Sequence, residues 1–264
     1  MPFGFLFDPR YFLFALPALA LVVFAQARVR SIYGRYSRAR NAYGLTGGDA
    51  ARRLLDRAGL GHIPIQVIPG ELSDNYDPQH KVLNLSQGVA NNASVASLGI
   101  AAHEIGHALQ DAQAYGPLRA RASIMPVANV GSQLGLGIFF VGLLLPALHF
   151  MAWIGVLLFS AVVVFTLVTL PVELNASHRA RQLLSSAGLL NATEMEGVGK
   201  VLNAAALTYV AALAQALAGH AAVFSRRPRR LLDPREAAAA TRRGETGDRS
   251  PRSTVPSRRG RHTI

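Results

Sequence analysis

Two histidines and a glutamate stand close together in the stretch GIAAHEIGHALQDA, residues 99–112. On a helix, His103 and His107 project from one face, a turn apart. This spacing lets both imidazoles reach one tetrahedral zinc ion, and it places Glu104 to act as a general base towards a water molecule. Burying these three polar side chains in so apolar a stretch would be costly without a metal. The pattern therefore predicts a Zn²⁺ site rather than a pair of core histidines.

A third ligand is needed, because catalytic zinc usually has three protein ligands and one open position. The chain has no cysteine, so the ligand must be His, Asp or Glu. Glu173 is the first charged residue after a long apolar segment, and it heads a stretch with helical apolar spacing. We expect Glu173 to be the ligand, with His178 as its competitor and Glu194 and Glu196 as more distant alternatives.

Long uncharged segments indicate a membrane protein. Half of the residues are hydrophobic and only 16% are charged. Residues 1–27 contain an uncharged run that we interpret as a retained transmembrane anchor, although AQA at 25–27 is also typical of a signal-peptide cleavage site. No Asp, Glu, Lys or Arg occurs in residues 130–170, and residues 146–153 offer a break. We predict a hairpin of two transmembrane helices over residues 130–171.

The hairpin is what allows the metal site to form. Two crossings return the chain to the face that it left, so Glu173 emerges on the same side as His103 and His107. We expect a helix in residues 172–200 to supply this ligand. Residues 201–224 form a fourth, Ala-rich apolar helix, which either spans the membrane or packs beside the catalytic part.

Residues 28–129 are polar and form the predicted catalytic region. The spacing of apolar residues predicts a helix over 47–60, with Asp49 as its N-cap and Gly59 at its end. A second helix, over about 92–114, carries the two histidines.

Two short strands are predicted between these helices. Residues 63–70 and 81–86 have strand patterning and are joined by a turn-rich segment, which suggests a small hairpin. The strand at 81–86 could accept an extended peptide by edge pairing. Tyr76 and His80 lie in the turn and could stabilise an oxyanion, but exposed turn residues without a role are more common.

Four segments together resemble the YugP-like membrane zinc metallopeptidases, relatives of the HtpX-type integral-membrane proteases. They are AAHEIGHALQDA, the apolar hairpin, LPVELNASHRA and VLNAAALTYVAALAQAL. The resemblance covers about residues 5–224 and leaves out the C-terminal tail.

This resemblance implies a zincin-like fold, Glu173 as the third zinc ligand and Glu104 as the catalytic base. In HtpX-like proteases an Asp stands four positions after the glutamate ligand, where this chain has Ser177. We expect Asn175, Ser177 or a backbone carbonyl to orient the histidine ligands instead.

Charge distribution predicts the orientation. Eleven Lys and Arg lie in residues 28–129 and none in 146–153, which places the catalytic face in the cytoplasm, at a bacterial inner membrane. One feature conflicts, because a spanning 201–224 would put the twelve Arg of the tail outside. Either that run does not span, or the tail is translocated against the bias, or the orientation is inverted.

The tail, residues 225–264, carries most of the net charge of +12. Its composition predicts disorder, and its arginines could contact anionic lipid headgroups. It contains no aromatic residue, so specific nucleic-acid binding is not expected.

The sequence thus predicts a mostly α-helical integral membrane protein with three to four transmembrane helices and a zincin-like α+β catalytic part holding a small sheet. We expect a membrane-embedded zinc endopeptidase acting on protein or peptide substrates. The alternative is a non-proteolytic membrane scaffold with a structural zinc, whose closed site would need a fourth ligand such as His178.

Overall fold

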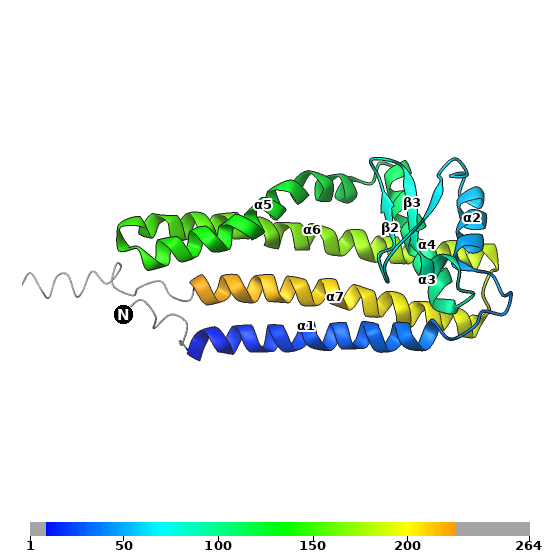
Figure 1. Cartoon of the computed structure of the whole chain (residues 1–264), viewed down its shortest axis with the longest axis horizontal. Coiled ribbons are helices and arrows are strands. Elements are labelled where there is room, and N and C mark those ends of the chain that lie inside the picture. Colours follow the sequence, from blue (N-terminus) through cyan, green and yellow to red (C-terminus); the bar gives the residue numbers. More distant parts are fainter. Residues whose placement is uncertain (1–8, 225–264) are drawn as a thin grey trace, which may run out of the picture. The chain divides into compact units, whose positions relative to one another are not determined.

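A computed structural model of the chain describes residues 9–224, and the tail predicted to be disordered lies outside them. The chain divides into two units at residues 224 and 225. The described unit is mostly helical with one small sheet, as the sequence predicts. Four long helices run through it (Figure 1): α1 (Pro9–Tyr36), α5 (Gly116–Leu144), α6 (His149–Ala187) and α7 (Ala192–Phe224).

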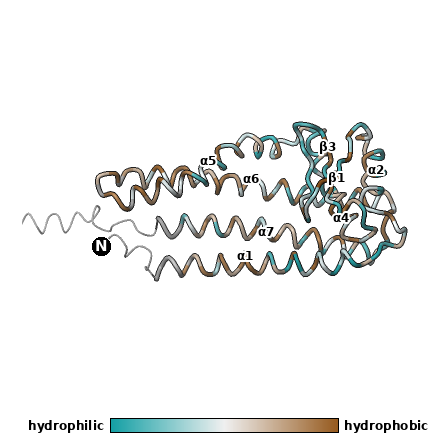
Figure 2. Tube along the Cα trace, viewed as in Figure 1, coloured by the Kyte–Doolittle hydropathy of each residue, from teal (hydrophilic) through white to brown (hydrophobic). Residues whose placement is uncertain are grey.

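Each long helix contains a segment long and apolar enough to cross a membrane. Helix α5 packs along α6, α1 packs along α7, and α6 also contacts α7. Large apolar side chains on these helices face outwards; Leu157, for example, is 73% exposed. Hydrophilic residues gather instead at the end where the sheet, α2 and α4 lie (Figure 2). Ala25, inside the AQA sequence, is buried in α1.

The predicted hairpin corresponds to α5 and α6, which are joined by a 3₁₀ turn at Pro146–Leu148. Gly131, Gly135 and Gly142 of α5 lie so close to α6 that an added Cβ would meet backbone atoms, whereas Gly137 faces open space. Three of these four glycines therefore permit close approach of the two helices.

Helix α6 is longer than the sequence predicts. It continues through the end of the apolar segment to Ala187 and ends at Gly188, whose φ of 63° is left-handed. Glu173 therefore lies on the returning helix of the hairpin itself. The helix expected over residues 172–200 is divided instead between α6 and α7.

The polar end of the unit is formed by the residues that lie between α1 and α5 in the sequence. It contains α2 (Gly47–Arg57), β1 (Ile65–Ile68), β2 (Asn75–Asp77), β3 (Val82–Ser86), α3 (Gln87–Ala90) and α4 (Val95–Ala112). Helix α4 begins after Ser94, whose side chain accepts a hydrogen bond from the backbone N–H of Ser97. It buries Ala101, Ala102 and Ile105 completely and contacts α2, α6 and α7.

The N-cap of α2 is Thr46 and not Asp49, which corrects the prediction. Asp49 is the third helical residue: its backbone N–H donates to the Thr46 side chain, and its carboxylate accepts from the Thr46 N–H. This reciprocal capping box satisfies two backbone donors with one residue pair. Gly59, with φ of 73°, follows the C-cap Ala58 and ends the helix as expected.

The sheet differs from the predicted hairpin. Its strand order is β1-β3-β2, with β1 parallel and β2 antiparallel to β3. The segment expected to be only a turn supplies β2, which has three residues and little strand propensity. Since β3 is paired on both sides, an added peptide cannot pair with it, and the expectation for residues 81–86 is wrong. Strand β2 is an edge of the sheet.

Helices α4 and α6 touch backbone to backbone at Gly106. A Cβ at this position would lie 2.5 Å from the carbonyl oxygen of Ala176. Only a residue without a side chain permits this approach, which brings the two histidines of α4 beside the part of α6 that contains Glu173.

We expect Gly106→Ala to force α4 and α6 apart and to destabilise the metal-free protein by about 1–3 kcal/mol. The measurement is the thermal unfolding midpoint in detergent with a chelator present. Gly34→Ala in α1 is the matched control, because a Cβ there meets no atom within 4 Å, and its midpoint should stay the same or rise. Equal midpoints for the two variants would contradict the close packing.

Candidate metal centre

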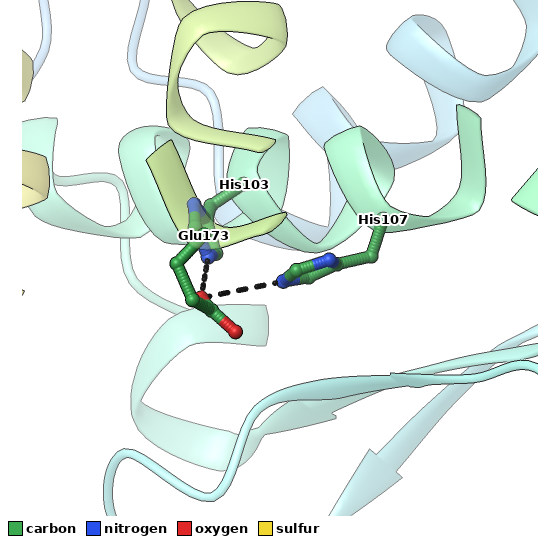
Figure 3. A group of neighbouring side chains, drawn as sticks. All are labelled: His103, His107 and Glu173. Atoms are coloured by element: carbon green, nitrogen blue, oxygen red, sulfur yellow. Dashed lines mark hydrogen bonds and ion pairs between the residues drawn. The ribbon is translucent and has the colours of Figure 1, made fainter. Parts of the chain in front are cut away.

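Three side chains from two helices that are far apart in the sequence meet at one point (Figure 3). His103 and His107 come from α4 and Glu173 from α6, and their ligand atoms all lie within 4.8 Å of one another. The Oε2 atom of Glu173 is 3.2 Å from His103 Nε2 and 3.5 Å from His107 Nε2. Ligand atoms held by tetrahedral zinc at 2.0–2.1 Å are about 3.3 Å apart, so the donor set and its spacing fit zinc.

The competing ligands lie elsewhere. His178 is exposed on α6, and Glu196 forms a surface ion pair with Lys200. Glu194 accepts hydrogen bonds from the backbone N–H groups of Ala42 (2.6 Å) and Asn191 (2.8 Å). Within residues 9–224, the candidate metal group therefore contains three ligands. A closed structural site with His178 as fourth ligand has no support in this geometry.

Gln110 fixes the ring of His107. Its amide nitrogen donates to the carbonyl of Val172 (2.8 Å) and to Asn175 Oδ1 (3.0 Å). Its oxygen therefore faces His107 Nδ1 at 2.9 Å, and that nitrogen must carry the proton. The other ring nitrogen, Nε2, faces Glu173, and its lone pair would be available to a bound metal ion.

Ser177 orients the other ring, because its Oγ lies 3.2 Å from His103 Nδ1. It occupies the position where HtpX-like proteases have an Asp. Asn175 also contributes, but indirectly through Gln110. Gln110 itself was missed by the sequence analysis, although it lies three residues after His107 on the buried face of the helix.

Arg121, also unanticipated, binds the second oxygen of the glutamate. Its Nη1 donates to Glu173 Oε1 at 2.8 Å. This bond leaves Oε2 alone to face the two imidazoles, so the carboxylate presents a single ligand atom. Glu173 is only 3% exposed, and a buried carboxylate needs such partners.

Glu104 is not part of the three-ligand group, but it lines the same cleft as the three candidate ligands. Its Oε2 accepts a hydrogen bond from the backbone N–H of Tyr76 in β2 at 3.1 Å. Burial raises the pKa of Glu104 above its ordinary value, and the nearby imidazoles of His103 and His107 oppose this rise. A carboxylate with a raised pKa is suited to accept and return a proton.

The cleft in front of the site has a volume of about 690 Å³. Strand β2 and helices α4, α5, α6 and α7 all contribute to its walls. Tyr209 of α7 was also missed; it lines the cleft with its hydroxyl near Glu173. A phenol O–H in this position is able to donate a hydrogen bond to negative charge in the cleft.

The two turn residues considered as oxyanion donors are occupied otherwise. The hydroxyl of Tyr76 donates to Asp111 Oδ2 at 2.8 Å. His80 is bound to Asp77 at 2.7 Å and is largely exposed. Both interactions hold β2 and its turn in place. Because β2 is the edge strand that borders the cleft, strand addition at this site would involve β2.

Comparison with known proteins agrees with this geometry. Residues 11–225 match a family described as "putative neutral zinc metallopeptidase". The chain belongs to this zinc metallopeptidase family. It is 45% identical over 197 residues to the "Putative membrane protease YugP" of Bacillus subtilis (strain 168), an alignment that covers 75% of this chain and 87% of that protein. No solved structure matches it significantly.

Family membership indicates the cofactor and the general chemistry of the protein. The protein is a membrane zinc peptidase, and its cofactor is zinc. A peptidase family implies peptide or protein substrates, and four helices are long and apolar enough to cross a membrane.

Replacing Gln110 tests how the ring of His107 is held. We expect Gln110→Leu to weaken zinc binding by about 10–100-fold, because the ring of His107 loses its orienting partner. The control is Gln113→Leu, one turn further on, which removes only an exposed contact with Arg179. Zinc affinity is measured by competition with a chromogenic chelator. Equal affinities in both variants would show that Gln110 does not orient the ligand.

Proposed function

We propose that the protein is an endopeptidase in which His103, His107 and Glu173 hold zinc and Glu104 is the general base. This is the HExxH-plus-glutamate arrangement of gluzincins. The observation that supports it is the convergence of the three ligand atoms at a cleft that Glu104 also lines.

The hydrogen bonding of Glu104 suits it to act as a general base. One carboxylate oxygen is held by the Tyr76 N–H, so the other is left to accept a proton from the attacking water. The same carboxyl group then returns that proton to the leaving amine. A bound zinc ion supplies the Lewis acidity that makes water nucleophilic near neutral pH. Gln110 and Ser177 keep the two imidazoles oriented throughout.

Two substitutions separate catalysis from metal binding. Glu104→Gln should keep about one zinc per chain but lower the hydrolysis of labelled casein by about 10²–10⁴-fold, because the base is lost. Glu173→Ala should lose zinc as well as activity. Zinc content by atomic emission and casein hydrolysis are measured on the same preparations. Full activity in Glu104→Gln would disprove the mechanism.

We further propose that the catalytic end faces the cytoplasm from a bacterial inner membrane. The excess of Lys and Arg in residues 28–129 over the hairpin turn supports this orientation. Helix α7 is long and apolar enough to span, which would place the start of the tail on the opposite side. With a spanning α7, this orientation would require translocation of the Arg-rich segment after it; with an α7 that does not span, it would not. Contact of this tail with anionic lipid stays a prediction.

The lack of cysteine in the chain permits a direct test of orientation. Tyr43→Cys adds one thiol at a residue that is 64% exposed at the catalytic end, and Ala147→Cys adds one at the exposed hairpin turn. In intact spheroplasts, a membrane-impermeant maleimide should label Ala147→Cys alone, and both should react after lysis. The reverse pattern would place the catalytic end outside.

A further inference from the structure

Charged residues end abruptly at the candidate metal centre. Arg121 is the last one on α5 and Glu173 is the next in the sequence, on α6; residues 122–172 contain no Asp, Glu, Lys or Arg. The two side chains are hydrogen-bonded to each other, so both helices change from polar to apolar at the same level. In a membrane protein such a change marks the boundary between water and hydrocarbon. The metal centre therefore lies at that boundary.

The cleft continues beyond this level on its α5 side. Ala122, Met125 and Pro126 line it, and Pro126 lies about 7.5 Å further along the helix than Arg121, at 1.5 Å per residue. Met125 keeps 46% of its surface exposed, so this wall is accessible at the level of the apolar segment. On α7, the lining residue Tyr209 also lies beyond Lys200, after which residues 201–224 carry no Asp, Glu, Lys or Arg.

The opposite half of the cleft is polar. It is lined by Asp77 and Gln79 at β2 and by Arg119 at the start of α5. Asp77 is paired with His80, while Arg119 is exposed and has no side-chain partner among residues 9–224. Glu104 and the histidines lie between the two halves. One cleft thus joins a water-facing and an apolar surface across the reacting position.

We propose that the substrates are membrane-anchored polypeptides, cleaved in the segment directly next to the anchor. This inference rests on the proposed proteolytic function. The apolar residues of such a segment match the Ala122–Pro126 wall, and its polar residues match the β2 half. A chain held in the same bilayer also reaches the cleft at a high effective concentration, whereas a soluble peptide must bring apolar side chains to a lipid-level surface from water.

Three pools of one randomised, internally quenched peptide test this in zinc-loaded proteoliposomes. The first pool is free, the second has a palmitoyl chain behind a spacer of about two residues, and the third has the same chain behind a flexible spacer of about 20 residues, with a mean reach of roughly 25 Å. The two lipidated pools partition alike and differ only in their distance from the membrane. The short-spacer pool should be cleaved at least about tenfold faster than either other pool, as expected for an effective-concentration gain.

Each other outcome has a definite meaning. Equal rates for the free and short-spacer pools, or for the two lipidated pools, overturn the inference and leave the proteolytic function standing. If no pool is cleaved at any rate above that of Glu104→Gln, the proteolytic function fails and the inference fails with it.

A pair of charge substitutions locates the preference in the cleft. Met125→Glu places a charge on the apolar wall, and the ratio of short-spacer to free cleavage should fall towards one. Val127→Glu is the matched control, because Val127 is 57% exposed on the same helix but does not line the cleft. Its ratio should stay high. An unchanged ratio in Met125→Glu, with zinc content retained, would show that this wall does not select the substrate.

Discussion

The close packing of α4 on α6 at Gly106 is the contact on which the rest of the site depends. Because no side chain intervenes, the carbonyl of Ala176 approaches the α4 backbone, and the Glu173 carboxylate reaches two imidazoles of the other helix. Gln110 completes the same interface by bonding to the carbonyl of Val172. The packing of the two helices and the positions of the three candidate ligands therefore depend on the same two residues, Gly106 and Gln110.

The membrane imposes a second constraint on the same residues. The hairpin of α5 and α6 must return to the face it left, or Glu173 could not meet α4. It must also end its apolar segments at the level of the site, where Arg121 and Glu173 bind each other. Each charge satisfies the other at a depth where an isolated charge would be costly. The metal centre, the polar–apolar boundary and the cleft consequently coincide.

Local patterns in the sequence were sufficient for much of the fold. The existence of the α4 helix and of the two-helix hairpin follows from apolar periodicity and the absence of charge, whereas the start of α4 after Ser94 was placed only approximately. Short-range errors arose where two residues share one role: Thr46 and Asp49 form the cap of α2 together. The prediction of the sheet was wrong for another reason. Strand β2 has three residues with weak propensity and exists because β3 and Glu104 supply its hydrogen-bond partners.

The sequence alone determined the donor types, the helical spacing of His103 and His107, the lack of cysteine ligands and the apolar segments, because these depend on residues near one another in the chain. Only the tertiary structure decided that Glu173 rather than His178 faces the imidazoles. It also decided that Gln110 and Ser177 hold the rings, and that Arg121 takes the second carboxylate oxygen. These choices depend on the rotation and distance between helices distant in sequence, which packing sets and local pattern does not encode.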